Sequence, residues 1–112
     1  MSDRILKINE LILQQLGEIM NREVEMPGVF ITITRVTTSA DLHYSTVYVS
    51  VMPDDKLEYA VNKLNLLSKR LRGELADKIV LRSVPRLEFR SDVSGKEASD
   101  IDALLDRIKD EV

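Results

Sequence analysis

The residues with the clearest potential for chemistry lie in one short stretch, where Asp41 and His43 are two positions apart, close to Ser39 and Ser45. A hydrolytic triad needs a nucleophile, a base and an orienting acid that a scaffold brings together beside an oxyanion hole. The sequence has no nucleophile elbow and no phosphate-binding loop that would supply such a scaffold. We therefore interpret Asp41 as a turn residue that bonds the backbone, and His43 as a surface residue.

Metal and thiol chemistry find little support in the composition. Cysteine is absent and His43 is the single histidine, which excludes disulfides, thiolate catalysis, zinc knuckles and iron–sulfur clusters. Five carboxylates recur near the C-terminus, at Asp100, Asp102, Asp106, Asp110 and Glu111. On a terminal helix such residues more often form a solvated face than a metal site. The sequence predicts neither an enzyme nor a protein that binds a metal or cofactor.

The distribution of charge along the chain is more informative about function. The net charge is −3, yet residues 56–96 hold ten bases and five acids. Residues 1–55 hold four bases and eight acids, and residues 97–112 hold two bases and six acids. Any affinity for nucleic acid would have to come from the middle block, because both ends repel phosphate. A solvated surface of mixed charge is the alternative that composition leaves open.

The candidate RNA-binding residues belong to one predicted helix and to the strand that follows it. They are Lys69, Arg70, Arg72, Lys78, Arg82, Arg86 and Arg90. In a strand, Arg82, Arg86 and Arg90 would project to the same side and could extend the basic cluster of the helix as a track for phosphates. Neighbouring carboxylates could instead neutralise these cations, and periodicity alone does not decide between the two.

Hydrophobic spacing predicts the elements that would position these side chains. Apolar residues recur at helical intervals from Ile5 to Met20, before the breaker Pro27-Gly28. Residues 29–36 and 44–51 alternate as two strands of an antiparallel hairpin. A second apolar stripe over 57–75 predicts a helix, and 79–90 a third strand in which Pro85 indicates an edge or a bulge. A capping box at 94–97 predicts a short closing helix.

This order predicts one α+β domain over residues 1–112, with helices on one face of a three-stranded sheet. No apolar run approaches the roughly 18–20 residues of a membrane span, and no secretory h-region follows the first residues. We therefore expect a cytoplasmic protein without a membrane segment. Aromatic residues make up only 4% of the chain, which disfavours a stacking platform for single-stranded bases.

Three stretches of the chain resemble a known family. Residues 31–36 (ITITRV) and 41–51 (DLHYSTVYVSV) are similar to the hairpin of ribosome-binding factor A. Residues 81–92 (LRSVPRLEFRSD) reproduce that family's Arg-x-x-Pro-x-Leu-x-Phe-x-x-Asp signature in full. Because these separated motifs occur in the family's order and the likeness spans the chain, the protein is identified as a member.

The resemblance implies a type II KH-like fold of order α-β-β-α-α-β and a function without catalysis. Members bind the free small (30S) ribosomal subunit, contact 16S rRNA in the neck near the decoding-centre helices, promote late maturation and rRNA processing, and support growth in the cold. It also implies that a maturation GTPase assists release in some bacteria. We expect a monomer without cofactors. The alternative is an α+β adaptor that binds proteins and does not contact RNA.

The sequence departs from the family pattern at two places. The family has an Ala-x-Gly kink between its two middle helices, where this chain has Leu67-Ser68-Lys69. A left-handed backbone is unfavourable for Lys, so we expect a milder bend that uses Ser68, or one continuous helix from Leu57 to about Ala76. Many relatives also extend a basic C-terminus, whereas this chain ends in Asp110-Glu111-Val112. RNA contact is therefore expected to rest on the core domain.

Overall fold

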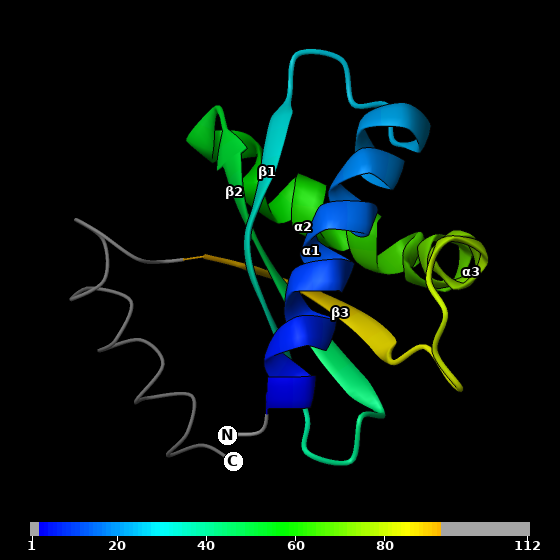
Figure 1. Ribbon diagram of the computed structural model, residues 1–112. Coiled ribbons are helices and arrows are strands. Elements are labelled where there is room, and N and C mark those ends of the chain that lie inside the picture. The colour runs from blue at the N-terminus through cyan, green and yellow to red at the C-terminus, as the bar shows by residue number, and fades with distance from the viewer. Residues whose placement is uncertain (1–2, 93–112) are drawn as a thin grey trace, which may run out of the picture.

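The elements of the computed structural model follow the predicted order (Figure 1), over the residues that the structure describes, 3–92. They are α1 (Asp3–Glu23), β1 (Phe30–Thr38), β2 (Tyr44–Met52), α2 (Leu57–Leu66), α3 (Ser68–Lys78) and β3 (Arg86–Ser91), with a 3-10 turn at Asp54–Lys56 before α2. This confirms the α-β-β-α-α-β order of a type II KH-like fold. The closing helix predicted after the capping box at 94–97 lies outside the described residues.

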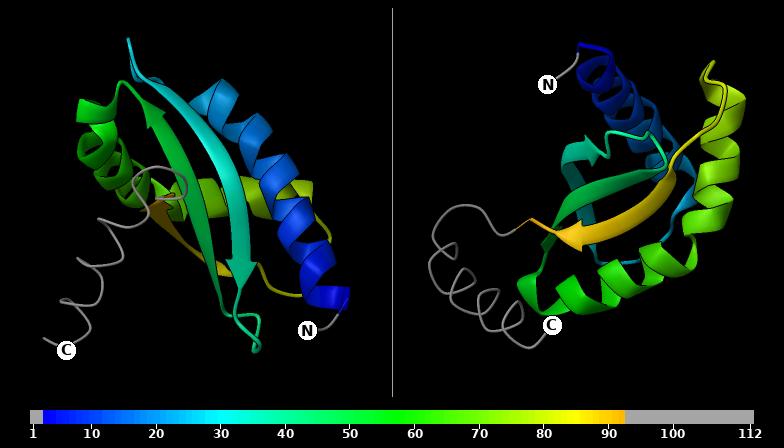
Figure 2. Two further views of the ribbon diagram at one scale, coloured as in Figure 1. Left: turned by 90° about the vertical axis from the view of Figure 1, so that its left-hand side faces the viewer. Right: turned by 90° about the horizontal axis from the view of Figure 1, so that it is seen from below.

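The three strands form one sheet in the order β1-β2-β3. The hairpin β1–β2 is antiparallel, as predicted, and β3 pairs with β2 in parallel. In Figure 2 the helices lie on one face of this sheet and leave its other face uncovered by described residues. The predicted third strand over 79–90 is too long, because residues 79–85 form no ladder. Pro85 has no N–H to donate, and β3 begins directly after it as an edge strand.

The core lies between the sheet and the helix layer. The inner side chains of β2 and β3, among them Val47, Val49 and Phe89, are buried, with exposures of 0–1%. The stripe of α1 packs on them through Ile8, Ile12, Leu16 and Ile19, and α2 and α3 add Leu64, Leu71 and Leu75. Each fully buried aliphatic side chain contributes roughly 1.5–3 kcal/mol, so this contact fixes where the helices sit.

A β-bulge in β1 changes which side chains face the core. The register shifts between Ile33, opposite Val49, and Arg35, opposite Tyr48, so that Thr34 is the extra residue. Before the bulge the odd residue Ile33 faces inward, and after it Val36 does. Arg35 is thereby turned outward, and its guanidinium lies 4.0 Å from the centre of the Tyr48 ring.

The segment after Leu57 is not one continuous helix. It is interrupted at Leu67, whose φ is −89° and ψ −1°, and Figure 2 shows that the axes of α2 and α3 point in clearly different directions. The bend is therefore larger than predicted. It nevertheless uses no left-handed residue at Lys69, since in the described chain only Leu42 and Gly28 have positive φ. Ser68 takes part, as predicted, because its hydroxyl donates to the carbonyl of Leu87 at 2.5 Å.

Candidate nucleic-acid interface

The bend brings polar side chains of α2 and α3 against the free edge of β3. Asn65 bonds both backbone groups of Phe89, and Ser68 bonds the carbonyl of Leu87. The Nε and Nη2 of Arg72 donate to the carbonyl of Val84 at 2.9 and 2.7 Å. These bonds fix the distance between α3 and the loop before β3, and they hold Arg72 in one orientation.

A hollow of about 430 Å³ lies between this bend and β3. Lys69 and Arg72 line it from α3, and Arg86 lines it from the first position of β3. Side chains from two elements thus place three cations around one concave surface. A surface of this kind can hold one or more phosphate groups of a nucleic-acid backbone.

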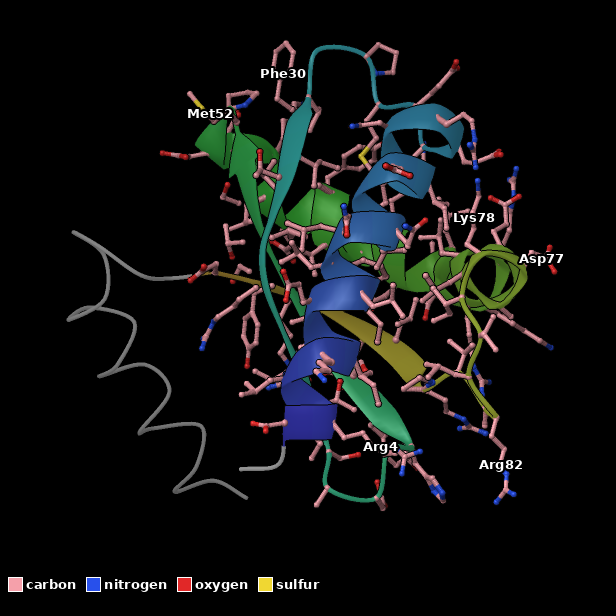
Figure 3. All side chains as sticks on the ribbon, in the orientation of Figure 1. Arg4, Phe30, Met52, Asp77, Lys78 and Arg82 are labelled. Carbon is pink, nitrogen blue, oxygen red and sulfur yellow. The ribbon has the colours of Figure 1, made fainter. Side chains whose placement is uncertain are left out.

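Three further hollows continue from the first and share residues with one another. One of about 240 Å³ is also lined by Arg72 and Arg86 and adds His43. The next, about 250 Å³, shares His43 and adds Arg82 and Arg4, and the last, about 370 Å³, shares Arg4 and adds Lys7. Figure 3 shows Arg4 and Arg82 pointing to the same side of the molecule. We name this row the basic track, consisting of Lys7, Arg4, Arg82, His43, Arg86, Arg72 and Lys69.

In the described part of the chain, the lysine and arginine side chains of the basic track are free of carboxylate partners, whereas the Nδ1 of His43 lies 3.9 Å from Asp41. Within residues 3–92, no acid lies within 4.0 Å of the charged groups of Arg4, Lys7, Lys69, Arg82 and Arg86. Arg72 is bonded to a neutral carbonyl, which leaves its positive charge uncompensated. Unpaired cations in a row attract a polyanion more strongly than cations held in ion pairs.

Three of the seven predicted residues lie apart from the track. Arg70 pairs with Glu23 at 3.4 Å, in the last turn of α1, and Arg90 pairs with Glu88 at 2.7 Å on the outer face of the sheet. In Figure 3, Lys78 lies on the upper side of α3 near Asp77, well away from Arg82. The shared strand face predicted for Arg82, Arg86 and Arg90 is wrong, because Arg82 lies in the loop before β3. Arg86 and Arg90 do lie on the same face of β3.

The structure adds Arg4, Lys7 and His43, which sequence reasoning did not select. Arg4 and Lys7 belong to the acidic N-terminal block, and His43 follows the hairpin turn. No local pattern joins Arg4 and Lys7 to the loop at 79–85, which lies some 70 to 80 residues further along the chain. The structure makes the connection, because Ile8 of α1 and Leu81 of the loop line the same two hollows as these cations.

The hairpin turn holds His43 at the edge of the track. Asp41 accepts hydrogen bonds from the hydroxyl of Ser39 at 2.6 Å and from the N–H of His43 at 3.0 Å. These two bonds lower the pKa of Asp41, and the bond from Ser39 has the larger effect. Leu42 between them adopts a left-handed backbone, with φ 64°. Asp41 is therefore a turn residue, as predicted, and the hydroxyl of Ser39 is directed to Asp41 instead of His43.

Residues 3–92 contain no group of three or more His, Cys, Asp or Glu residues that could hold a metal ion. Among the helices in the same range, none is both long and apolar enough to cross a membrane.

Comparison with known proteins decides the family. The family model of ribosome-binding factor A matches residues 4–105. The chain belongs to the ribosome-binding factor A family. It is 34% identical to ribosome-binding factor A of Akkermansia muciniphila, over 96% of this chain and 86% of that one. Ribosome-binding factor A of Gemmatimonas aurantiaca is 33% identical, over 94% and 74% of the two chains.

Solved structures of ribosome-binding factor A share the fold. The crystal structure from Thermus thermophilus is 27% identical, has a TM-score of 0.69, and matches 78% of this chain and 94% of its own. A Thermus thermophilus homology model, fitted into the cryo-EM map of a complex of 30S with ribosome-binding factor A, is 30% identical with a TM-score of 0.65, over 73% and 88% of the chains. The resemblance inferred from residues 81–92 is therefore confirmed at the level of family and fold.

Proposed function

We propose that this protein binds the free small ribosomal subunit by contacting 16S rRNA along the basic track, and thereby promotes late maturation and rRNA processing without catalysis. The observation that supports this most directly is the row of lysine and arginine side chains in the basic track, which have no carboxylate partner within residues 3–92 and line four hollows that share residues. A relative of 30% identity has been fitted into a map of its complex with 30S, which is consistent with the same partner here.

The proposed mechanism depends on binding energy. Phosphates of folded RNA displace counterions from the cations of the track, and this term is independent of sequence. A factor that binds one arrangement of immature rRNA more tightly than another shifts the population toward it by that difference in affinity. No group that could act as a nucleophile is needed for this role. We further propose that the protein acts as a cytoplasmic monomer and that a maturation GTPase assists its release.

The predicted contribution of Arg70, Lys78 and Arg90 is revised in this proposal. Arg70 and Arg90 already have carboxylate partners, so a phosphate would have to compete with Glu23 or Glu88. Lys69, Arg72, Arg82 and Arg86 keep the role given to them from the sequence. Arg4, Lys7 and His43 are added to it.

Sedimentation with purified small subunits tests the proposal. The double variant Arg82→Glu with Arg86→Glu should bind much more weakly, whereas the matched variant Arg70→Glu with Arg90→Glu, which makes the same change of charge, should bind nearly as well as wild type. Circular dichroism verifies that both variants are folded. Unchanged binding of the first double variant, or binding that does not depend on salt, would overturn the proposal and favour a protein–protein adaptor.

A further inference from the structure

The sheet has two edges, and described residues cover only one of them. The edge of β3 is closed by the side chains of Asn65 and Ser68. β1, at the other edge, pairs with β2 alone, and Figure 2 shows α1 running alongside it. A strand that is paired on one side only can accept a further strand through its free backbone groups.

Two residues of β1 direct their backbone groups to this free edge. The carbonyl of Val49, in β2, accepts the N–H of Asp92 and therefore points to β3. Ile33 lies opposite Val49 across the hairpin, so the N–H and C=O of Ile33 point away from β2. Ile31 has the same orientation, because backbone groups alternate along a strand. Within residues 3–92, no hydrogen bond reaches either residue on that side.

The rest of β1 is closed to an added strand. Thr34 is the bulged residue and Arg35 after it carries a charge, and both features are typical of protected edges. Near the end of β1, the hydroxyl of Thr38 donates to the side-chain oxygen of Asn9 at 2.5 Å, which ties α1 to β1 there. The open part of the edge is therefore residues 30–33.

A hollow of about 250 Å³ lies beside this open stretch. Met20 and Val24 line it from α1, and Phe30 and Ile31 line it from β1. None of the described residues that line it is charged, and Phe30 is 75% exposed. In an added strand, every second side chain faces the same side as that of Ile31 and so lies next to the hollow.

The carboxylates beside the hollow are not paired. Glu25 directly follows Val24, and Glu10 lies on the same stripe of α1 as Val24 by helical spacing. Neither carboxylate has an ion-pair partner within residues 3–92. The nearby cation Lys63 donates to the backbone carbonyl of Glu25 and does not line the hollow. A second copy of this chain would bring the same carboxylates to the edge, so charge favours a basic partner.

We propose that the open edge of β1 binds an extended segment of a basic polypeptide, which adds a fourth strand to the sheet at Ile31 and Ile33. A neighbouring strand supplies N–H and C=O groups at the spacing of these two residues, which a helix does not. Apolar side chains at every second position of the segment contact the hollow, and cations that flank them lie near Glu25 and Glu10.

This interface is separate from the basic track. The hollow beside β1 shares no lining residue with the four hollows of the track, so both surfaces can be occupied at once. The proposal does not depend on the proposed function, and every measurement below is made without ribosomes. Failure of one is therefore distinct from failure of the other.

Amide hydrogen exchange of the full chain, followed residue by residue by NMR, tests the free edge. The N–H of Thr32 is directed to β2, whereas those of Ile31 and Ile33 are not, so Ile31 and Ile33 should exchange faster by about tenfold or more. Slow exchange of both in the free chain would show that the edge is already covered, and would overturn the proposal. Protection that grows with protein concentration would show that a second copy covers it, with the same consequence.

The heptapeptide KKVTVKK is the probe, because its central residues can pair with the edge and its lysines match the two acids. At a concentration of about ten times its dissociation constant, it should slow the exchange of Ile31 and Ile33 about tenfold. The peptide EEVTVEE has the same core with the opposite charge and should bind about tenfold more weakly or worse. Equal binding of the two peptides would contradict a basic partner.

N-methylated probes test whether backbone pairing carries the binding. Methyl groups on both valine nitrogens remove the two donors that face β1, and should weaken binding by about tenfold or more. A methyl group on the threonine nitrogen, which points away from β1, should weaken it by less than about threefold. Equal losses from the two modifications would mean that no strand is added.

A variant of the protein with a matched control tests the hollow. Asn21 is exposed and lines the hollow, so Asn21→Lys brings a positive charge near the lysines of KKVTVKK and should weaken binding several-fold. Gln15→Lys makes the same change of charge one turn from Leu11, on the side of α1 that borders the basic track, and should leave binding nearly unchanged. Circular dichroism verifies that both variants are folded. Wild-type affinity of Asn21→Lys for the probe would overturn the proposal.

Discussion

Asn65 in α2 replaces a missing neighbouring strand for Phe89 in β3. Its side-chain oxygen accepts the Phe89 N–H at 2.8 Å, and its Nδ2 donates to the Phe89 carbonyl at 3.0 Å. An edge strand presents unpaired backbone groups, which are a template for aggregation when they are not covered. One amide side chain therefore closes the edge at the residue whose ring is 1% exposed in the core.

Replacing Asn65 should accordingly destabilise the fold. Asn65→Ala removes both bonds and leaves two backbone groups of β3 without a protein partner, so we expect a loss of about 1–3 kcal/mol in the free energy of unfolding. Urea denaturation followed by circular dichroism measures it. Asn62→Ala, on the exposed surface of the same helix, is the matched control and should change stability by less than about 0.5 kcal/mol. Equal effects of the two substitutions would contradict this account.

Introducing the family's glycine at position 69 should not help this chain. Lys69 is helical with a negative φ, so Lys69→Gly gains no relief from strain and loses helix propensity. We expect the variant to be less stable by about 1 kcal/mol. Thermal unfolding checks this, with Lys69→Ala as the control for loss of the side chain. A Gly variant more stable than the Ala variant would mean that the bend prefers a left-handed residue.

The hairpin turn should make stability depend on pH through Asp41. Hydrogen bonds from Ser39 and the His43 N–H lower the pKa of Asp41 in the folded state, below its ordinary value of 3.8. A group with a depressed folded pKa contributes stability above its unfolded pKa and loses this contribution as pH falls through the folded pKa. Wild type should therefore exceed Asp41→Asn in stability at neutral pH, and the difference should shrink below about pH 4.

Chemical denaturation at several pH values measures this difference. Asp55→Asn is the control, because the carboxylate of Asp55 makes no hydrogen bond or ion pair within residues 3–92. Its difference from wild type should stay nearly constant over the same range. A constant difference for Asp41→Asn as well would show that the turn bonds do not favour the ionised form.

The basic track predicts how binding to small subunits responds to salt. Each phosphate contact contributes roughly 0.7–0.9 to the slope of log affinity against log salt concentration. Arg4→Ala and Arg82→Ala should each lower that slope by roughly one unit, whereas Arg70→Ala should leave it nearly unchanged, since Arg70 is paired with Glu23. Pelleting assays at several salt concentrations provide the slopes. A larger effect of Arg70 than of Arg82 would place the interface elsewhere on α3.

The sequence alone determined the family and the order of elements, apart from the break between α2 and α3 at Leu67, because both depend on local patterns. The apolar stripe from Ile8 to Ile19, the alternation of Val47, Val49 and Val51, and the signature from Arg82 to Asp92 each occupy one continuous stretch. Burial then follows directly, since each of these patterns has only one face that can pack against the others. Four cations of the basic track, including Arg72 and Arg86, could be selected from the sequence because they lie in one basic stretch of the chain.

Only the tertiary structure decided which cations form one surface. The change of direction at Leu67 and the late start of β3 after Pro85 place Arg72 beside Arg86 and separate both from Arg70 and Arg90. Arg4 and Ile8 of α1 line one hollow with Leu81 and Arg82, although these two pairs lie far apart in the sequence. This proximity arises from contacts between segments that are distant in the sequence. The spacing of residues within one segment cannot predict such contacts.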